Sequence, residues 1–193
     1  MEVTFLVRDS FEKAQEMLEK NGYELLSYRT MEDRYFSRFD DEELKNLTFP
    51  TIINNAILLR QMCDEHLVNY LCFKNKTYDE NDNVIDEEKI QTTVAQYDVA
   101  CEVLEKAGLN KFAGYLTHLY VYQKGDDCFA LQKIDGLGLF IECEEDNRHK
   151  DLSVEDKKEE LKQIVYSTGL ALGDDPFVKK LEMYLDKKYD RVE

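Results

Sequence analysis

Glu142 and Glu144, separated by a single residue, lie near the end of a β-type run. The run "LFIECEE" covers residues 139–145 and follows the glycine turn of Gly136 and Gly138. Residues i and i+2 of a strand share a face, so Glu142 and Glu144 point to the same side as Phe140. Two carboxylates on a covered face repel each other unless a cation lies between them. The pair therefore indicates either a site for a cation or part of a solvated acidic surface.

The other face of the same run is apolar. Leu139, Ile141 and Cys143 alternate with the glutamates, and we expect them to be buried against an outer helix. The glutamates then face solvent or the hollow of a closed sheet. In a sheet with one solvated face, the solvated alternative is the default.

Composition and charge limit the classes of function. The chain has 193 residues, 43% of them hydrophobic, which is enough for one good-sized packed domain or two very small ones. Its formal net charge of −16 argues against binding to a nucleic-acid backbone. The same charge argues mildly against highly anionic ligands, unless a local pocket reverses the sign.

Patterns that would indicate a membrane or secretion are missing from the sequence. No run approaches 18 apolar residues, and the first residues lack a basic segment followed by an apolar one. The five cysteines are widely spaced without a CxxC pair, which is typical of reduced core thiols. We therefore expect a cytoplasmic protein with no membrane partner and no zinc site.

Secondary-structure signals predict a mixture of strands and helices. A strand is expected over residues 2–8, a helix after a cap at Asp9 or Ser10 that ends at Gly22, and a hairpin around Arg29–Asp33. Two further helices are predicted in the tail, over 153–169, capped at Ser153, and over 174–189. The other expected strands lie in 51–62, 67–78, 113–124, 128–134 and 139–145, with a helix over 95–109. These elements predict a single α+β domain, mostly antiparallel, with its helices outside the sheet.

Other motifs are weak. "DENDN" at 79–83 has the acidic spacing of a calcium loop, but Val84 and Ile90 stand where that loop needs Gly and Glu, so a polar hairpin loop is expected. The three histidines, His66, His118 and His149, have no metal-ligand spacing. No glycine-rich phosphate loop and no evident nucleophile are present.

Read in order, the motifs resemble those of the CYTH family, which includes class IV adenylate cyclases and thiamine triphosphatases. "LQKIDGLGLFIECEE" resembles the family's "L-D-E-V-x-G-L-G-x-F-x-E-I-E", in which the second glycine and both glutamates coincide with Gly138, Glu142 and Glu144. "DRYFS" at 33–37, "LLR" ending at Arg60 and "LCFKNK" at 71–76 resemble the family's "D-x-Y-F", "L-R-I-R" and "L-T-Y-K-G". The helix "DVACEVLEKAGL" also has a counterpart there.

The resemblance implies an eight-stranded antiparallel β-barrel that forms a tunnel. It further implies one CYTH-like domain over 1–193, with the C-terminal helices of about 153–190 packed on the barrel. The expected Mg²⁺ or Mn²⁺ ligands are Glu2, Glu142 and Glu144. The expected phosphate ligands are Arg60 and Lys74.

The sequence departs from the family's pattern at four ionic positions. Thr4 and Leu6 stand where the opening E-x-E-x-K strand has its second glutamate and its lysine. Leu58 replaces the first arginine of "R-I-R", and Gln132 replaces the aspartate of "L-D-E-V". Phosphoryl transfer depends on cations that clamp the phosphates, so these losses weaken the expected clamp.

Two functional hypotheses follow from this balance. The first is a divergent tunnel protein that binds a divalent metal and a small phosphorylated or nucleotide-like ligand, with catalysis altered or lost. The alternative is an active metal-dependent triphosphate hydrolase or adenylate cyclase that uses the retained acidic residues. The sequence leaves open whether two copies form a homodimer. With few basic neighbours, Glu142 and Glu144 are expected to repel each other and to destabilise the metal-free protein.

Overall fold

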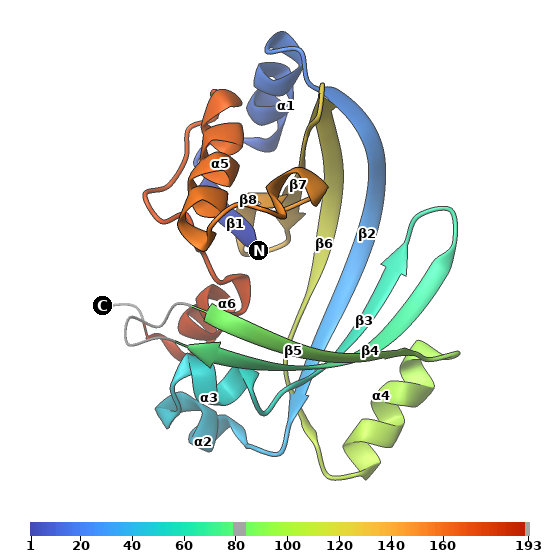
Figure 1. Cartoon of the computed structure of the whole chain (residues 1–193). Helices are drawn as coiled ribbons and strands as arrows, with labels where there is room; N and C mark the ends of the chain where they lie inside the picture. The colour runs from blue at the N-terminus through green and yellow to red at the C-terminus, as the bar shows by residue number, and fades with distance from the viewer. Residues whose placement is uncertain (79–83, 192–193) are drawn as a thin grey trace. The chain divides into compact units, whose positions relative to one another are not determined.

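The chain folds around one antiparallel sheet. The computed structural model describes residues 1–78 and 84–191. They form two compact units, Met1–Arg29 with Thr117–Met183, and Thr30–Leu116 with Tyr184–Glu193, which we call the first and the second unit. The strands, labelled in Figure 1, are hydrogen-bonded to one another in the order β1 (Glu2–Val7), β8 (Gly138–Glu144), β7 (Asp127–Ile134), β6 (Asn110–Lys124), β2 (Glu24–Ser37), β3 (Ile57–Cys63), β4 (Leu67–Tyr78) and β5 (Val84–Thr93).

The predicted α+β class and the eight antiparallel strands are confirmed. Within the described residues, β1 and β5 each have one neighbour in this strand order, so closure into a barrel remains a prediction. The hairpin expected around Arg29–Asp33 is wrong, because β2 continues through it and pairs with β3 from Thr30 to Phe36. That stretch contains none of the Gly, Pro or Asn residues that favour a tight turn.

The core of the first unit lies between the sheet and two amphipathic helices. These are α1 (Phe11–Lys20) and α5 (Val154–Ser167), which begin at the caps Ser10 and Ser153 as predicted. In Figure 1 both helices lie in the same unit as β1, β7 and β8. The inward residues of β1 and β8 in this core are Val3, Phe5, Val7, Leu139, Ile141 and Cys143.

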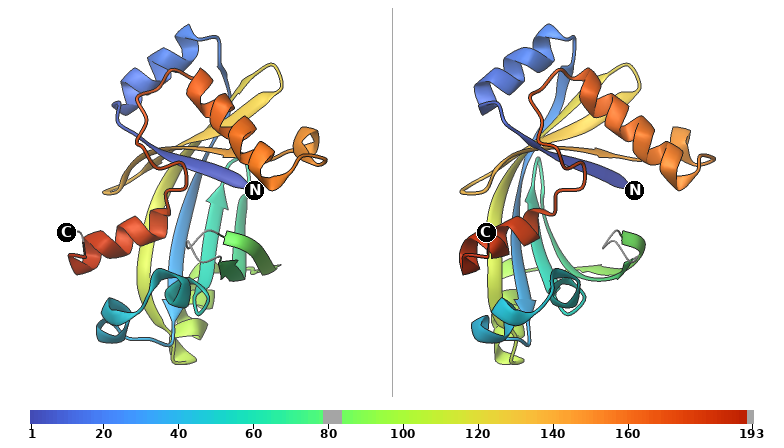
Figure 2. Two further views of the ribbon diagram at one scale, coloured as in Figure 1. Left: turned by 60° about the vertical axis from the view of Figure 1, so that its left-hand side comes forward. Right: turned by 90° about the vertical axis from the view of Figure 1, so that its left-hand side faces the viewer.

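A segment without helical structure follows α5 and runs beside the free edge of β1 (Figure 2). The amide of Thr4 donates to the carbonyl of Pro176 at 2.9 Å, and the amide of Val178 donates to the carbonyl of Thr4 at 3.0 Å. The last helix, α6 (Lys180–Tyr189), therefore begins six residues later than predicted, because residues 176–178 are held in an extended bridge. A short 3-10 helix, Asn147–His149, precedes α5.

The second unit has a separate core on the side of its sheet that faces α4 (Tyr97–Lys106). Phe36, Leu59 and Leu71 of the sheet pack there with Tyr97 and Leu104 of the helix. The short helices α2 (Asp41–Asn46) and α3 (Phe49–Ile53) connect β2 to β3. Residues 51–53 are thus helical, and only the later part of the strand expected in 51–62 is a strand.

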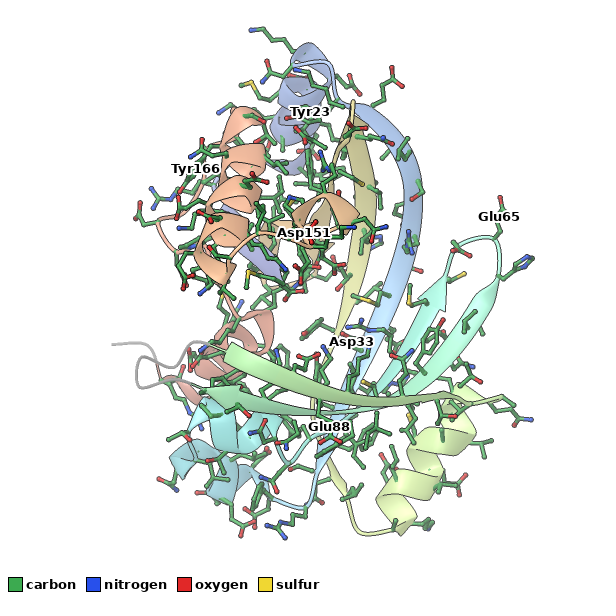
Figure 3. All side chains as sticks on the ribbon, in the orientation of Figure 1. Tyr23, Asp33, Glu65, Glu88, Asp151 and Tyr166 are labelled. Carbon is green, nitrogen blue, oxygen red and sulfur yellow. The ribbon has the colours of Figure 1, made fainter. Side chains whose placement is uncertain are left out.

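Side chains on the opposite face of this sheet include Asp33, which is labelled in Figure 3.

All five cysteines are free thiols, as predicted, but Cys63 and Cys128 are exposed and so are not core residues. No helix in the described part of the chain has the length and apolar character needed to cross a membrane. The polar loop expected at 79–83 lies outside the described residues.

Candidate functional site

Three of the predicted site residues come together in the first unit. Glu2 of β1 lies directly opposite Glu144 of β8, and Thr4 lies opposite Glu142. Because alternate residues of paired strands share a face, the three glutamates project from the same side of the sheet. One carboxylate oxygen of each lies within 4.8 Å of the others. We call Glu2, Glu142 and Glu144 the acidic cluster.

Burial changes along the face that carries the acidic cluster. Thr4, Gln132 and Phe140 are buried on it, although it is the face opposite the α1 and α5 core. Glu142 is largely covered, with 14% of its side chain exposed, whereas Glu2 and Glu144 are exposed. The face is therefore covered at one end of the cluster and open to water at the other.

A lysine that the sequence analysis did not select contacts the covered carboxylate. The ammonium group of Lys180, the first residue of α6, donates a hydrogen bond to Oε2 of Glu142. It also donates to Oε1 of Gln132 at 2.8 Å. The hydroxyl of Thr4 lies 3.5 Å from the same Glu142 oxygen. The expectation that the glutamate pair has few basic neighbours is therefore wrong for Glu142.

No spacing pattern in the sequence indicates this contact. Lys180 lies 38 residues after Glu142, in a segment rich in lysine, and no spacing rule connects the two. A weak signal does exist, because Gln132 supplies a neutral amide oxygen where the family pattern has a carboxylate. The positive charge of Lys180 is already balanced by Glu142, so a neutral amide oxygen is enough to accept its second hydrogen bond.

Arg60 in the second unit is held by a carboxylate. Its Nε and Nη2 each donate to one oxygen of Asp33 at 2.7 Å. The two residues lie opposite each other on β3 and β2. Asp33 is 1% exposed, whereas 32% of the Arg60 side chain remains exposed. This two-bond arrangement is the geometry that an arginine also uses to bind phosphate, so the Asp33 carboxylate occupies the groups expected to bind the ligand.

Two tyrosines lie close to this ion pair. The hydroxyls of Tyr35 and Tyr115 are 3.2 Å apart. Burial raises the pKa of both phenols, and the negative charge of Asp33 adds to this effect. Burial also opposes the charge of Arg60, but the pKa of Arg60 is raised because the attraction of Asp33 outweighs it. Both phenols are therefore neutral hydrogen-bonding groups beside a permanently charged guanidinium.

Lys74 is also paired, through a residue of β5. Oε1 of Glu87 lies 3.2 Å from Nζ of Lys74, and Oε2 of Glu87 lies 3.1 Å from Nζ of Lys76. Burial tends to raise the pKa of Glu87, but the two lysines outweigh it and hold that pKa below its usual value. We call Arg60, Lys74 and Lys76 the basic group of the second unit. These three cations face two carboxylates, those of Asp33 and Glu87.

The four departures from the family pattern lie on the same faces as the retained residues. Thr4 and Leu6 share a face of β1 with Glu2, and Gln132 lies opposite Phe140 on the Glu142 face. Leu58 and Arg60 share a face of β3, where Leu58 is 7% exposed. Each of the four replaced residues therefore lies on the face of the sheet that carries either the acidic cluster or Arg60.

Comparisons with known proteins show the fold. No family model matches the sequence, and no curated protein matches it. Among solved structures, protein PH1819 of Pyrococcus horikoshii OT3 has a TM-score of 0.67 and 18% identity, over 97% of this chain and 99% of that one. A proposed adenylate cyclase of Vibrio parahaemolyticus has a TM-score of 0.61 and 14% identity, over 95% and 96% of the two chains.

A third similar structure is HpAC1 of Hippeastrum, an adenylyl cyclase candidate described as having a dominant triphosphatase activity. Its TM-score is 0.59 and its identity 13%, over 95% of this chain and 94% of that one. The chain shares its fold with these proteins. The resemblance seen in the motifs is thus matched by a resemblance in fold over nearly the whole chain. At these identities the likeness shows the fold alone.

Proposed function

We propose that the protein is a divergent CYTH-like tunnel protein that binds a divalent metal and a phosphorylated or nucleotide-like ligand, with catalysis altered or lost. The observation that carries this proposal is the acidic cluster, whose three carboxylates lie within 4.8 Å of one another on one face. The proposal includes closure of the sheet into a tunnel. It includes neither nucleic acid nor membrane as a partner, and it leaves a homodimer open.

The donor set of the acidic cluster fits a hard divalent cation. Glu2, Glu142 and Glu144 offer only carboxylate oxygens, the ligands that Mg²⁺ and Mn²⁺ prefer. Mg²⁺ usually keeps several waters, and the exposure of Glu2 and Glu144 leaves room for them. When bound, such an ion would supply positive charge next to the oxygens of a phosphate. The three glutamates would hold that ion, with Glu142 on the buried side and Glu2 and Glu144 on the side open to water.

The basic group supports binding more than turnover. Rapid phosphoryl transfer needs cations directed at charge that develops in the transition state. Here Arg60 is paired with Asp33, while Lys74 and Lys76 share Glu87. A triphosphate would have to compete with these carboxylates for each cation. Leu6 and Leu58 offer no substitute, so we expect a ligand with fewer charges than a triphosphate.

The alternative is an active triphosphate hydrolase or adenylate cyclase. Retention of all three carboxylates of the acidic cluster favours it. The likeness in fold to HpAC1 is consistent with it. Lys76 and Lys180 are cations that the sequence analysis did not count, and they could replace part of the lost charge.

Thermal unfolding tests the metal site. Divalent metal that binds the folded chain should raise its Tm by mass action, and this rise should disappear in the double variant Glu142→Gln, Glu144→Gln. Mg²⁺ is compared with NaCl at equal ionic strength, because a solvated acidic surface responds to both salts alike. Equal shifts in the two salts would exclude the acidic cluster as a metal site.

A substrate panel tests catalysis separately. ATP, inorganic triphosphate and thiamine triphosphate are each assayed with Mg²⁺ and with Mn²⁺. We expect turnover to be absent or very slow, because each missing charge-assisted contact removes about 1.5 to 3 kcal/mol and several are missing. Rapid turnover of any one substrate, abolished by Glu142→Gln, would establish the alternative instead.

A further inference from the structure

Glu142 already has a cationic partner that belongs to the chain. Lys180 donates to Oε2 of Glu142 and, at 2.8 Å, to Gln132. The Lys180 side chain is 20% exposed and that of Glu142 is 14% exposed, so the contact is largely removed from water. An ion pair in such surroundings is screened far less than one on an open surface.

The position of Lys180 is set by backbone contacts as well as by its charge. Residues 176–178 are hydrogen-bonded to both backbone groups of Thr4, which lies opposite Glu142 in the register of β1 and β8. Lys180 follows this bridge by two residues and opens α6. The start of the helix is therefore attached to the strand beside the acidic cluster. This attachment restricts the positions open to Lys180 and holds its ammonium group near Glu142.

We propose that Lys180 is the resident cation of Glu142, and that Lys180 and a divalent metal ion are mutually exclusive partners of that carboxylate. The proposal rests on the proposed metal site. It assigns a role to a residue on α6, outside the strands that carry the acidic cluster. Lys180 then sets how strongly the cluster binds metal.

The charges explain why exclusion is expected. A divalent ion bound to all three carboxylates needs Glu142, whose Oε2 accepts hydrogen bonds from Thr4 and Lys180. An ammonium group at hydrogen-bond distance from that oxygen would repel the ion strongly, because both are cations in partly buried surroundings. Metal binding must therefore break the Lys180 bond first, so the affinity of the parent protein is lower than three carboxylates alone would give.

Replacement of Lys180 tests this directly. The test variant is Lys180→Met, which keeps an unbranched apolar side chain without the charge. The control is Lys179→Met, which removes an equal charge from the adjacent residue, whose ammonium group pairs with Glu182. Mn²⁺ alone is the probe, and its Kd is measured by isothermal titration calorimetry. We expect Lys180→Met to bind Mn²⁺ about ten-fold more tightly or better, because no charge-assisted bond has to be broken first.

Stability and NMR provide two further measurements. Metal-free Lys180→Met should have a lower Tm than the parent, because Glu142 has lost its charge-assisted hydrogen bond to Lys180. Saturating Mg²⁺ should then raise its Tm by more than it raises that of the parent. In parent protein whose lysines carry ¹³C-methyl labels, Mg²⁺ should shift the Lys180 signal and leave that of Lys179 in place. If Lys180→Met folds poorly, Lys180→Gln replaces it in all three measurements.

The possible results separate the two proposals. Equal Mn²⁺ affinity in the parent and Lys180→Met would overturn exclusion while the metal site stands. Equal gains in Lys180→Met and Lys179→Met would also overturn it, because the effect would then be one of net charge. A Lys180 signal that does not move at saturating Mg²⁺ would show that the ammonium group stays in place. Absence of Mn²⁺ binding to every variant would overturn the metal site and, with it, the exclusion.

Discussion

The carboxylate of Asp33 accepts two hydrogen bonds from the guanidinium of Arg60, each 2.7 Å long. The two partners differ in burial, because Asp33 is 1% exposed while the Arg60 side chain is 32% exposed. Arg60 has a route to water and Asp33 has none. The pair is therefore structurally asymmetric, and its two halves should respond differently to substitution.

The first prediction concerns this asymmetry. Arg60→Met leaves a buried carboxylate without its partner and should lower the free energy of unfolding by about 3 to 5 kcal/mol. Asp33→Asn leaves an arginine that can still reach solvent, so it should cost less than half as much. Urea unfolding of both variants measures the difference. Equal losses would mean that Arg60 is as dependent on the pair as Asp33.

A second prediction concerns the lysines of β4. Glu87→Gln removes the carboxylate shared by Lys74 and Lys76, so inorganic triphosphate should bind about three-fold more tightly or better. The matched control is Glu88→Gln, the same change at the next residue, on the opposite face of β5. Calorimetric titration at two salt concentrations measures both. Identical affinities in the two variants would remove Lys74 and Lys76 from the phosphate site.

The third prediction is a dependence of stability on pH that comes from Asp9. Its side chain accepts hydrogen bonds from the ammonium group of Lys13 and from the amide of Ala171, the latter at 2.8 Å. These two bonds lower the pKa of Asp9 in the folded state. The stabilisation is therefore fully present above the unfolded pKa of about 3.9 and is lost as the pH falls through the folded pKa.

Asp9→Asn should accordingly cost a few tenths of a kcal/mol to about 1 kcal/mol at neutral pH. The difference from the parent should shrink in acid, where the parent loses the same charge. Asp174→Asn is the control, because the Asp174 side chain is almost fully exposed and its pair with Arg8 should contribute little at any pH. Unfolding measured between pH 2 and pH 7 follows the trend, and a constant difference across that range would contradict it.

A fourth prediction uses two glycines with the same backbone conformation. Gly169 and Gly136 both have φ of +74°, but an added Cβ at Gly169 would lie 2.9 Å from Nδ2 of Asn21 whereas one at Gly136 would meet nothing within 4 Å. That Asn21 amide donates to the carbonyl of Thr168 at 2.8 Å. Gly136→Ala should cost about 1 kcal/mol for the left-handed conformation alone. Gly169→Ala should cost distinctly more in thermal unfolding, and equal costs would mean that Asn21 moves aside freely.

Local sequence patterns predicted the parts of the fold that depend on local physics. The alternation of Leu139, Ile141 and Cys143 with the two glutamates identified both faces of β8 correctly, because a strand has a period of two. The caps at Ser10 and Ser153 were identified for a similar reason, since a capping side chain bonds within its own first turn.

The parts that were missed depend on distant contacts. β5 carries the polar run "DEEKIQTT" and forms a strand because β4 lies beside it, which no local pattern encodes. Likewise, the helix expected from residue 174 begins at Lys180 because Thr4 binds residues 176–178. The acidic cluster could be predicted from Glu142 and Glu144, but its partner Lys180 could not.

The bridge between Thr4 and residues 176–178 also bears on association between copies of the chain. A strand at the end of a sheet exposes backbone groups that can pair with another molecule and begin aggregation. At β1 the tail occupies the amide and the carbonyl of Thr4, and a second bridge joins Val7 to Leu172. At β5 the consecutive charges of Glu87, Glu88 and Lys89 discourage such pairing by a different means. Loss of residues 172–178 from this edge would therefore expose the backbone groups of β1 to pairing with another copy of the chain.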